Sequence, residues 1–198
     1  MRIKSQWFKS DREKTPQEIA GAMAFTIWRI ADNALKNTRR ANFEIAIGPQ
    51  YFSFITEFLV FLIQVADRIA HRQLPAEDRF AFTSTLANRV AETLTENQSR
   101  LLDDNITDHK QIFIDKLNQR AGEYAEFHYG VDGPEFAFTR YLAFCMREVM
   151  DEKDVEWVID QMMSIEAPNV VDMVEKTMKN LYTKEPAQTR IRKVTSGD

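Results

Sequence analysis

The sequence predicts an all-α fold, a single-domain bundle or orthogonal array of about seven helices. Apolar residues recur at intervals of three and four along most of the chain, as they do on the buried face of a helix. Prolines stand where helices would begin, because their fixed φ and missing N–H suit the first helical turn. No stretch alternates apolar and polar residues for long enough to predict a strand.

Three helices are expected in the first half of the chain. Thr15-Pro16-Gln17-Glu18 is a capping box with proline at the first helical position, and it opens a helix from 16 to about 40. Gly48-Pro49 begins a second helix that runs to about 73. Pro75 begins a third, which is amphipathic and ends near 99.

Four shorter helices are expected in the second half. An apolar stripe ending at Tyr124 predicts a helix over about 108–128. Two glycines and a proline in Gly130–Pro134 predict a loop, after which a fifth helix covers about 135–150. A sixth helix begins at Asp151 or Asp154, and Pro168 begins a seventh.

The second helix, about 49–73, is expected to be the central one. Between Tyr51 and Ala70 it is apolar around most of its circumference, which is typical of a helix enclosed by others. Its longest uncharged run, Phe58 to Ala66, is about half of what a bilayer crossing needs. The apolar stretch of a secretory signal is also missing near the N-terminus. We therefore expect neither a membrane span nor secretion by that route.

The composition is that of one globular domain with basic ends. Of the 198 residues 44% are hydrophobic and 28% charged, and a chain of this length can bury about 70% of its unfolded surface. We expect one helical domain over residues 15–182, between a basic segment at 1–14 and a basic tail at 183–198.

The net charge of −4 conceals an asymmetry between these parts. Residues 1–14 sum to +3 and residues 183–198 to +2, so the body between them carries −9. Phosphate backbones are bound by Lys and Arg clustered on a folded face, which an acidic body does not favour. We therefore expect no nucleic-acid partner.

Ionisable residues follow one strip of the second helix. Glu57, Asp67 and His71 lie there at helical spacing and are the candidate ligand-binding residues. In one interpretation the strip touches solvent or pairs with arginines of neighbouring helices, and the candidate partners are Arg29, Arg89, Arg140 and Arg147. In the other, the strip lines an internal polar pocket in which the three side chains converge on a ligand or a metal.

Signatures of metal and nucleophilic chemistry are missing. None of the three histidines has a glutamate three positions earlier, so the Glu-x-x-His motif of di-iron bundles does not occur. Cys145 is the single cysteine and lies among apolar residues, where burial raises the pKa of a thiol and makes it inert. It cannot pair within the chain, which fits a reducing cytoplasm. We expect no catalytic residue, no cofactor and no resident metal.

The leading hypothesis is a non-enzymatic cytoplasmic protein that acts through protein–protein interaction, as an adaptor, an assembly factor or a homo-oligomer. Large apolar residues outside the main stripes are the candidate interface: Trp7, Phe8, Phe25, Trp28 and Trp157. The alternative is a protein that binds a small apolar molecule in an internal pocket around the polar strip of the second helix. A carboxylate-based metal enzyme is the third hypothesis. No motif in the sequence selects among them.

Overall fold

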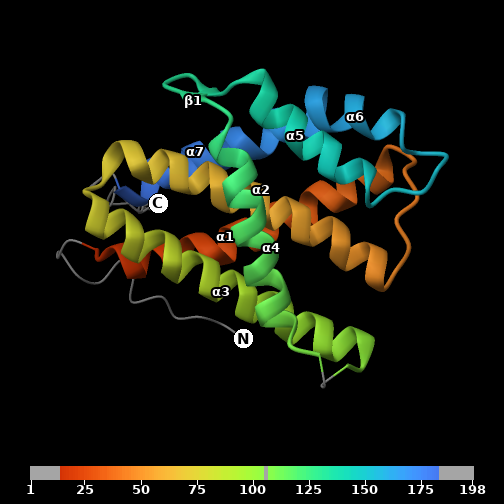
Figure 1. Ribbon diagram of the computed structural model, residues 1–198, viewed down its shortest axis with the longest axis horizontal. Helices are drawn as coiled ribbons and strands as arrows, with labels where there is room; N and C mark the ends of the chain where they lie inside the picture. Colours follow the sequence, from red (N-terminus) through yellow and green to blue (C-terminus); the bar gives the residue numbers. More distant parts are fainter. Residues whose placement is uncertain (1–13, 105–106, 183–198) are drawn as a thin grey trace, which may run out of the picture.

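A computed structural model describes residues 14–104 and 107–182, and these residues form the expected all-α fold (Figure 1). The helices are α1 (Pro16–Arg40), α2 (Pro49–Gln73), α3 (Ala76–Leu102), α4 (His109–Ala125), α5 (Phe136–Arg147), α6 (Trp157–Gln161), the π-helical turn η2 (Met162–Glu166) and α7 (Ala167–Tyr182). The first five begin within one residue of the predicted positions. None of these helices combines the length and the apolarity that crossing a bilayer demands.

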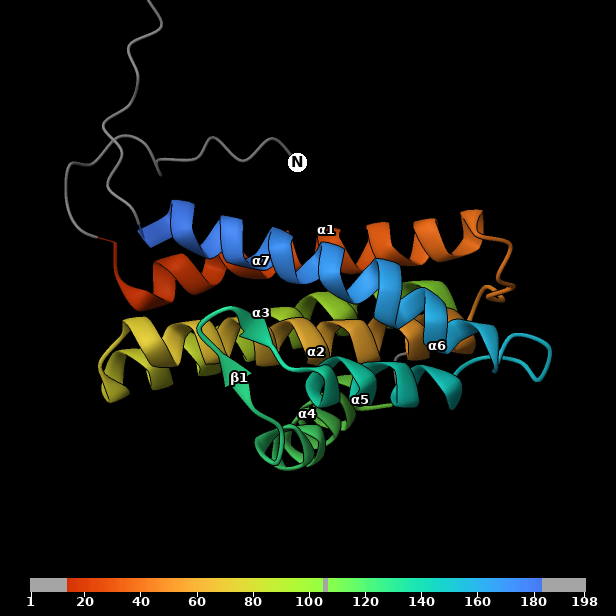
Figure 2. The same ribbon diagram turned by 90° about the horizontal axis from the view of Figure 1, so that it is seen from above.

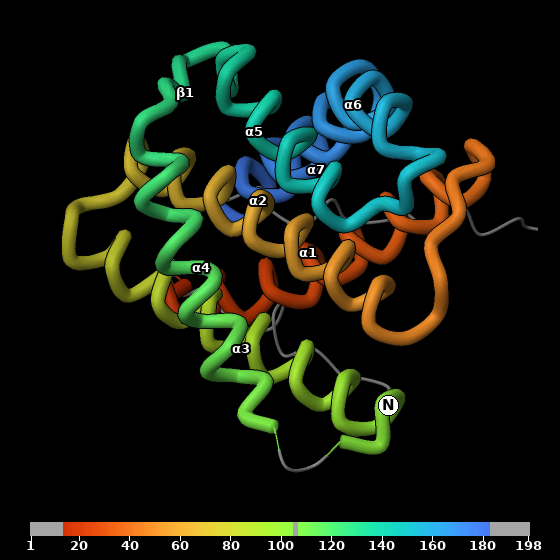
Figure 3. Tube along the Cα trace, turned by 45° about the vertical axis from the view of Figure 1, so that its right-hand side comes forward, coloured from red at the N-terminus to blue at the C-terminus, as the bar shows by residue number. Residues whose placement is uncertain are grey.

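The helices are arranged on two sides of a central pair. Figure 2 shows α1 and α7 on one side of α2 and α3, with α4 and α5 on the other. Both α1 and α7 contact α2, as do α3, α4 and α5. The helix α4 crosses α2 and α3 steeply instead of running along them, as the tube in Figure 3 makes clear. The architecture is therefore an array around α2 with crossed as well as antiparallel neighbours.

The prediction that α2 is the central helix is confirmed. Every residue from Phe54 to Ala66 is buried, on all sides of the helix. Apolar groups occupy most of these positions, and removing each large side chain from water contributes about 1.5–3 kcal/mol. Among the buried positions are the polar side chains of Glu57 and Gln64, whose burial requires partners.

The expected capping box opens α1. The Glu18 N–H donates to Thr15 Oγ1 at 3.2 Å, and the Thr15 N–H donates to Glu18 Oε2 at 3.0 Å. These bonds satisfy two of the N–H groups that a helix start leaves without partners. The second start, at Gly48, has φ +110, a conformation in which glycine avoids the strain that a side chain would suffer.

The predicted break at Pro168 is wrong. The segments α6, η2 and α7 follow one another without a gap, so the described residues form six continuous helical rods and not seven. Proline has no N–H for the carbonyl four residues before it, which is that of Ser164. A π-turn lies just before, where the Ala167 N–H donates to the Met162 carbonyl five residues earlier. The wider turn lets the helix continue past the proline.

The glycine-rich segment after α4 forms a minimal hairpin where a loop was expected. Strands β1 (Tyr129–Gly130) and β2 (Gly133–Pro134) pair in antiparallel fashion. Arg72 of α2 donates to the Gly130 carbonyl, and its guanidinium lies 5.2 Å from the centre of the Tyr129 ring. The Tyr129 hydroxyl donates to Glu175 of α7 at 3.2 Å. The hairpin is thus tied to two helices.

Candidate functional site

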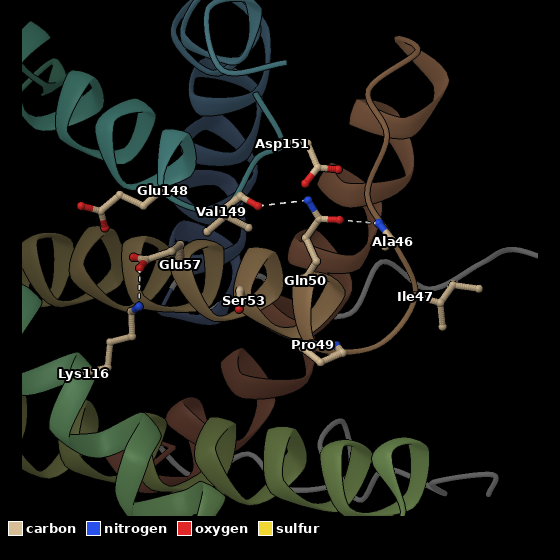
Figure 4. A pocket seen from close by; sticks show the side chains of 10 residues that line it. All are labelled: Ala46, Ile47, Pro49, Gln50, Ser53, Glu57, Lys116, Glu148, Val149 and Asp151. Atoms are coloured by element: carbon tan, nitrogen blue, oxygen red, sulfur yellow. Dashed lines mark hydrogen bonds and ion pairs between the residues drawn. The ribbon is translucent and has the colours of Figure 1, made fainter. Parts of the chain in front are cut away.

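Two adjoining hollows lie between α2, α4 and α5. Their volumes are about 620 and 640 Å³, and they share Lys116 and Glu148, so together they form one open groove. We call it the α2–α4–α5 groove. Its floor carries Glu57, Lys116 and Arg120, and one wall carries the rings of Phe127, Tyr141 and Phe144. Figure 4 shows the part of the groove that borders the start of α2.

The floor is an ion-pair network centred on a buried carboxylate. Glu57 of α2 is 3% exposed, and its Oε1 lies 2.7 Å from Lys116 Nζ and 3.0 Å from Arg120 Nη2, both of α4. Arg120 is nearly as buried, and it also contacts Glu123 and Glu148, each at 3.2 Å. A buried charge is tolerated only when it is paired and hydrogen-bonded, and here one guanidinium serves three carboxylates from three helical segments.

Electrostatics within the network favours the charged forms. Burial lowers the pKa of Arg120, but the hydrogen bond and the charge of Glu57 outweigh it, so the pKa is raised overall. Desolvation would raise the pKa of Glu123, yet hydrogen bonds from Tyr141 and Arg120 lower it below its usual value. The guanidinium therefore stays charged at any pH at which the protein is folded.

Tyr141 of α5 joins the ion pairs to the aromatic wall. Its hydroxyl accepts from Arg120 Nη1 at 2.7 Å and donates to Glu123, while the Arg120 guanidinium lies 5.6 Å from the centre of its ring. Burial and the Glu123 hydrogen bond raise the pKa of Tyr141. The phenol thus remains protonated, and its ring is held at a fixed place on the wall.

The aromatic wall continues from α4 onto the outer face of α5. The ring of Tyr141 lies 5.4 Å from that of Phe127 and 6.2 Å from that of Phe144, and the latter pair is stacked. Phe144 is 51% exposed. Phe136 stands eight residues earlier on α5, two turns away on the same stripe, and is also exposed. Phe144 therefore extends the packed aromatic cluster to the protein surface.

The groove is acidic overall. Five carboxylates line the groove against the two cations of its floor, which leaves a net charge of −3: Glu57, Glu123, Glu126, Glu148 and Asp151. Glu57 is enclosed, whereas the other four present oxygen atoms at the mouth. Because both cations already face carboxylates, the groove attracts positive charge and repels anions.

At the end that borders the start of α2, the groove is lined by Gln50, in the first turn of that helix. Its Oε1 accepts from the Ala46 N–H at 2.6 Å, and its Nε2 donates to the Val149 carbonyl at 3.1 Å (Figure 4). One amide thus ties the connection after α1 to the segment after α5, and both segments line the groove. The groove is therefore braced at both ends, by Gln50 and by Arg120.

The structure places the three predicted ligand residues in two separate environments. Asp67 and Glu57 are ten residues apart on α2, which is about 15 Å along the axis. Asp67 accepts from Arg79 Nη2 at 2.5 Å and from Thr83 Oγ1 at 2.6 Å, both on α3. His71 is exposed, with its Nδ1 3.1 Å from Arg79 Nη1. Glu57 lines the groove, and Asp67 and His71 form a local cluster with Arg79.

The predicted arginine partners of the strip are wrong. The candidates were Arg29, Arg89, Arg140 and Arg147, but the partners are Arg120 and Lys116 for Glu57 and Arg79 for Asp67. The crossing of α4 over α2 brings Lys116 and Arg120 to Glu57, and no sequence pattern indicates that angle.

The predicted interface residues are scattered. Phe25 is 60% exposed on α1 and Trp157 is 66% exposed at the start of α6, whereas Trp28 is partly buried against the core. Trp7 and Phe8 lie outside the described residues. None of the three described side chains lines the groove.

Cys145 is buried beside the network. Desolvation, with the nearby charge of Glu57, raises the pKa of its thiol to about 12. At neutral pH the thiolate is too scarce for nucleophilic chemistry. Within residues 14–104 and 107–182, no group of three or more His, Cys, Asp and Glu side chains is placed to hold a metal ion.

Comparison with known proteins leaves the groove without a counterpart: no family model matches the sequence, and neither the curated proteins nor the solved structures yield a match.

Sequence reasoning missed most of the groove, although a signal exists. Lys116, Arg120 and Glu123 are spaced four and three residues apart and so share one face of α4, and Phe127 follows four residues later, just after the helix ends. Taken from the sequence alone, that face looks like the polar flank of the apolar stripe that ends at Tyr124. On α5, Tyr141, Phe144 and Glu148 repeat the pattern. Two mixed stripes of charged and aromatic residues on successive helices could have indicated a shared surface.

Proposed function

We propose that this is a non-enzymatic cytoplasmic protein that works by binding a partner protein, and that its α2–α4–α5 groove takes a basic segment bearing apolar side chains. The observation that carries the proposal is the pairing of an acidic rim with an exposed aromatic wall above a rigid ion-pair floor. The cytoplasm is supported by the single buried thiol, which needs no oxidising compartment.

The rim and the wall suit the two parts of a Lys or Arg side chain. The carboxylates of Glu126, Glu148 and Asp151 offer acceptors to its charged end, and Phe144 offers a ring face over which a cation gains about 0.5–1 kcal/mol at an exposed site. The aliphatic stem can lie along the rings. Neighbouring apolar residues of the same segment would cover Phe127 and Val149.

The floor supplies rigidity more than direct contacts. Glu57 has two cations on one oxygen, and Arg120 has three carboxylates and a phenol, so little capacity is left for a ligand. A preformed surface spares the partner the entropy of ordering it. The same saturation disfavours the small-molecule alternative, because a compact ligand needs polar groups that converge on it inside an enclosed cavity.

Selection from a random peptide library displayed on phage tests the proposal. We expect the full-length protein to select peptides enriched in Lys or Arg together with Trp, Phe or Leu, with binding that weakens as salt increases. A variant carrying Glu126→Lys and Asp151→Lys, both exposed, should lose this selection.

The matched control reverses two exposed carboxylates outside the groove, Glu96 of α3 and Asp132 of the hairpin, to lysine. This control changes the net charge by the same amount and should select the same peptides as the unmodified protein. Selection of acidic or uncharged peptides, or equal losses in both variants, would contradict the proposal.

A further inference from the structure

We propose that the occupant of the α2–α4–α5 groove is the segment Met1–Lys9 of a second copy of this chain, so that two copies associate by exchanging these segments. The inference rests on the proposed function, since it names the partner of the same groove. Four properties of the chain support it: matching charge, matching apolar side chains, the position of the groove relative to the start of α1, and the contrast with the C-terminal tail.

The charges of the segment and of the groove are equal and opposite. Met1–Lys9 carries Arg2, Lys4 and Lys9 with no acidic residue, a net side-chain charge of +3. The groove carries −3. Complementary charge speeds encounter and fixes the register of a docked segment.

The apolar side chains of the segment also match the groove. Ile3, Trp7 and Phe8 alternate with its cations, and the wall offers the exposed ring of Phe144 beside that of Tyr141. Indole and phenyl rings gain about 0.5–1.5 kcal/mol from stacked or edge contacts beyond the area they bury. Trp is also among the residues enriched at the hot spots near the centres of protein interfaces.

Geometry assigns the segment to a different copy. The helices α1 and α2 run antiparallel along one another, and α4 and α5, which border the groove, lie on the opposite side of α2 from α1 (Figure 2). α1 is 25 residues long, or about 37 Å, whereas Glu57 lies only eight residues, about 12 Å, from the start of α2. The groove floor is therefore about 25 Å along the bundle from Pro16, and around its far side.

The linker within one chain is too short for that distance. If residues 1–9 fill the groove as far as its floor, the seven Cα-to-Cα steps from Lys9 to Pro16 must bridge the gap, and when extended they span at most about 25 Å. They would also have to pass around the layer of α2 and α3, which is about 10 Å thick. A second copy removes this constraint, and two reciprocal contacts close a dimer with twofold symmetry.

The C-terminal tail is the competing occupant within this chain. Residues 183–198 carry +2, but they contain two carboxylates and no aromatic side chain. They match the charge of the groove less well and cannot supply rings to its wall. The tail therefore serves as the matched control in the test.

Sedimentation velocity of full-length variants tests the exchange. We expect the unmodified protein to dimerise and the dimer to weaken with salt. Lys4→Glu with Lys9→Glu should weaken dimerisation by at least tenfold, as should Glu126→Lys with Asp151→Lys. Mixing these two variants in equal amounts should restore a heterodimer, because the normal segment of one fits the normal groove of the other and the reversed pair is again complementary. Arg190→Glu with Arg192→Glu, which shifts the net charge equally, should still dimerise.

Each contrary outcome overturns the inference. An unmodified protein that stays monomeric, a segment variant that dimerises like the unmodified protein, or a mixture that stays monomeric excludes segment exchange. If basic peptides are still selected by the groove in the library experiment, a different protein is the partner and the proposed function stands. If that selection fails as well, the proposed function falls with the inference.

Discussion

Two carboxylates on one helix show how differently ion pairs can be used. Asp67 pairs with one arginine of the adjacent α3, and the pair stays at the edge where α2 meets α3. Glu57 is more deeply buried and pairs with Arg120 of α4. Arg120 in turn bonds to Tyr141 of α5 and to Glu148 at the end of that helix. The first arrangement fastens two neighbouring helices. The second positions a surface made by three, which is why the groove is found at Glu57 and not at Asp67.

The largest expected effect comes from breaking the network at its centre. Glu57→Ala leaves Arg120 buried with less compensation, and breaking a buried pair in this way costs about 3–5 kcal/mol. Urea unfolding measures the loss. A loss below about 1 kcal/mol would mean that water or the other carboxylates replace Glu57 without penalty, and that the floor is not rigid.

The double change Glu57→Leu with Arg120→Met separates stability from positioning. Apolar residues of similar size can replace a buried ion pair at little net cost, so much of the stability should return. Tyr141 would still lose its Arg120 contact. We therefore expect recovered stability in urea but weakened binding of basic peptides, measured by fluorescence anisotropy. Recovery of both would show that the network does not position the wall.

A smaller effect is expected at the other carboxylate. Asp67→Asn removes a bidentate contact with Arg79, which is about one-third exposed, and weakens the bond from Thr83. Charged hydrogen bonds of this kind contribute about 1.5–3 kcal/mol at most, and solvent reduces that figure here. We expect a loss of about 1 kcal/mol in urea unfolding and unchanged peptide binding. Weakened peptide binding would show that the Asp67–Arg79 pair affects the groove, contrary to the separation seen in the structure.

A third buried carboxylate sharpens the comparison because, among the residues that the structure describes, no cation forms an ion pair with it. Glu166 is 1% exposed in η2 and receives a hydrogen bond from Gln161 Nε2 at 3.0 Å. Desolvation raises its pKa, and the amides of Gln161 and Asn37 oppose the rise only in part. The folded protein therefore holds this proton to higher pH than the unfolded chain does, and stability falls as pH rises through the raised pKa.

Glu166→Gln should accordingly stabilise the protein at neutral pH, by less than the Asp67 change costs. The gain should shrink as pH falls toward the ordinary range of a glutamic acid, where both side chains are neutral. Thermal unfolding followed between pH 4 and pH 8 measures the gain. Glu57→Gln is the contrasting variant: it removes the charge that faces Arg120 and should lower the stability at neutral pH. A variant less stable than the unmodified protein at neutral pH would contradict this account of Glu166.

The smallest effect is expected at an exposed ring outside the groove. Phe25 lies at the surface of α1, with the Arg29 guanidinium 5.8 Å from the centre of its ring. Phe25→Ala should change the stability by less than about 0.5 kcal/mol and leave peptide binding unchanged. Phe144→Ala on the wall should weaken binding instead. Anisotropy titrations of both variants against one basic peptide compare them, and equal losses would place the interface elsewhere.

Helical periodicity and local capping signals were enough to predict most of the helices. The bounds of α1 and α2 follow from Thr15, Gly48 and the apolar stripes, since these signals act within a few residues. The break expected at Pro168 did not occur, because a π-turn can absorb the missing hydrogen bond and no local signal announces it. Periodicity does not predict the angles at which the helices pack.

The groove depends on those angles. The sequence singled out Glu57 as an unusual charge on an apolar helix, and burial explains why it stood out. Its partners come from positions 59 and 63 residues further along the chain, where Lys116 and Arg120 look like ordinary surface residues of an amphipathic helix. A stripe pattern says which residues share a face but not which helix will cover that face.

The most direct test of the account maps where a basic segment binds. We would titrate a peptide with the sequence of residues 1–9 into the isotope-labelled Lys4→Glu/Lys9→Glu chain, whose own segment no longer competes, and follow the backbone amide signals by NMR. The account predicts that the largest shifts fall on the stretch from Lys116 to Phe127, which covers the end of α4, and on the stretch from Tyr141 to Asp151, and that they vanish in high salt. Shifts centred on Phe25 or Trp157, or no shifts at all, would contradict it.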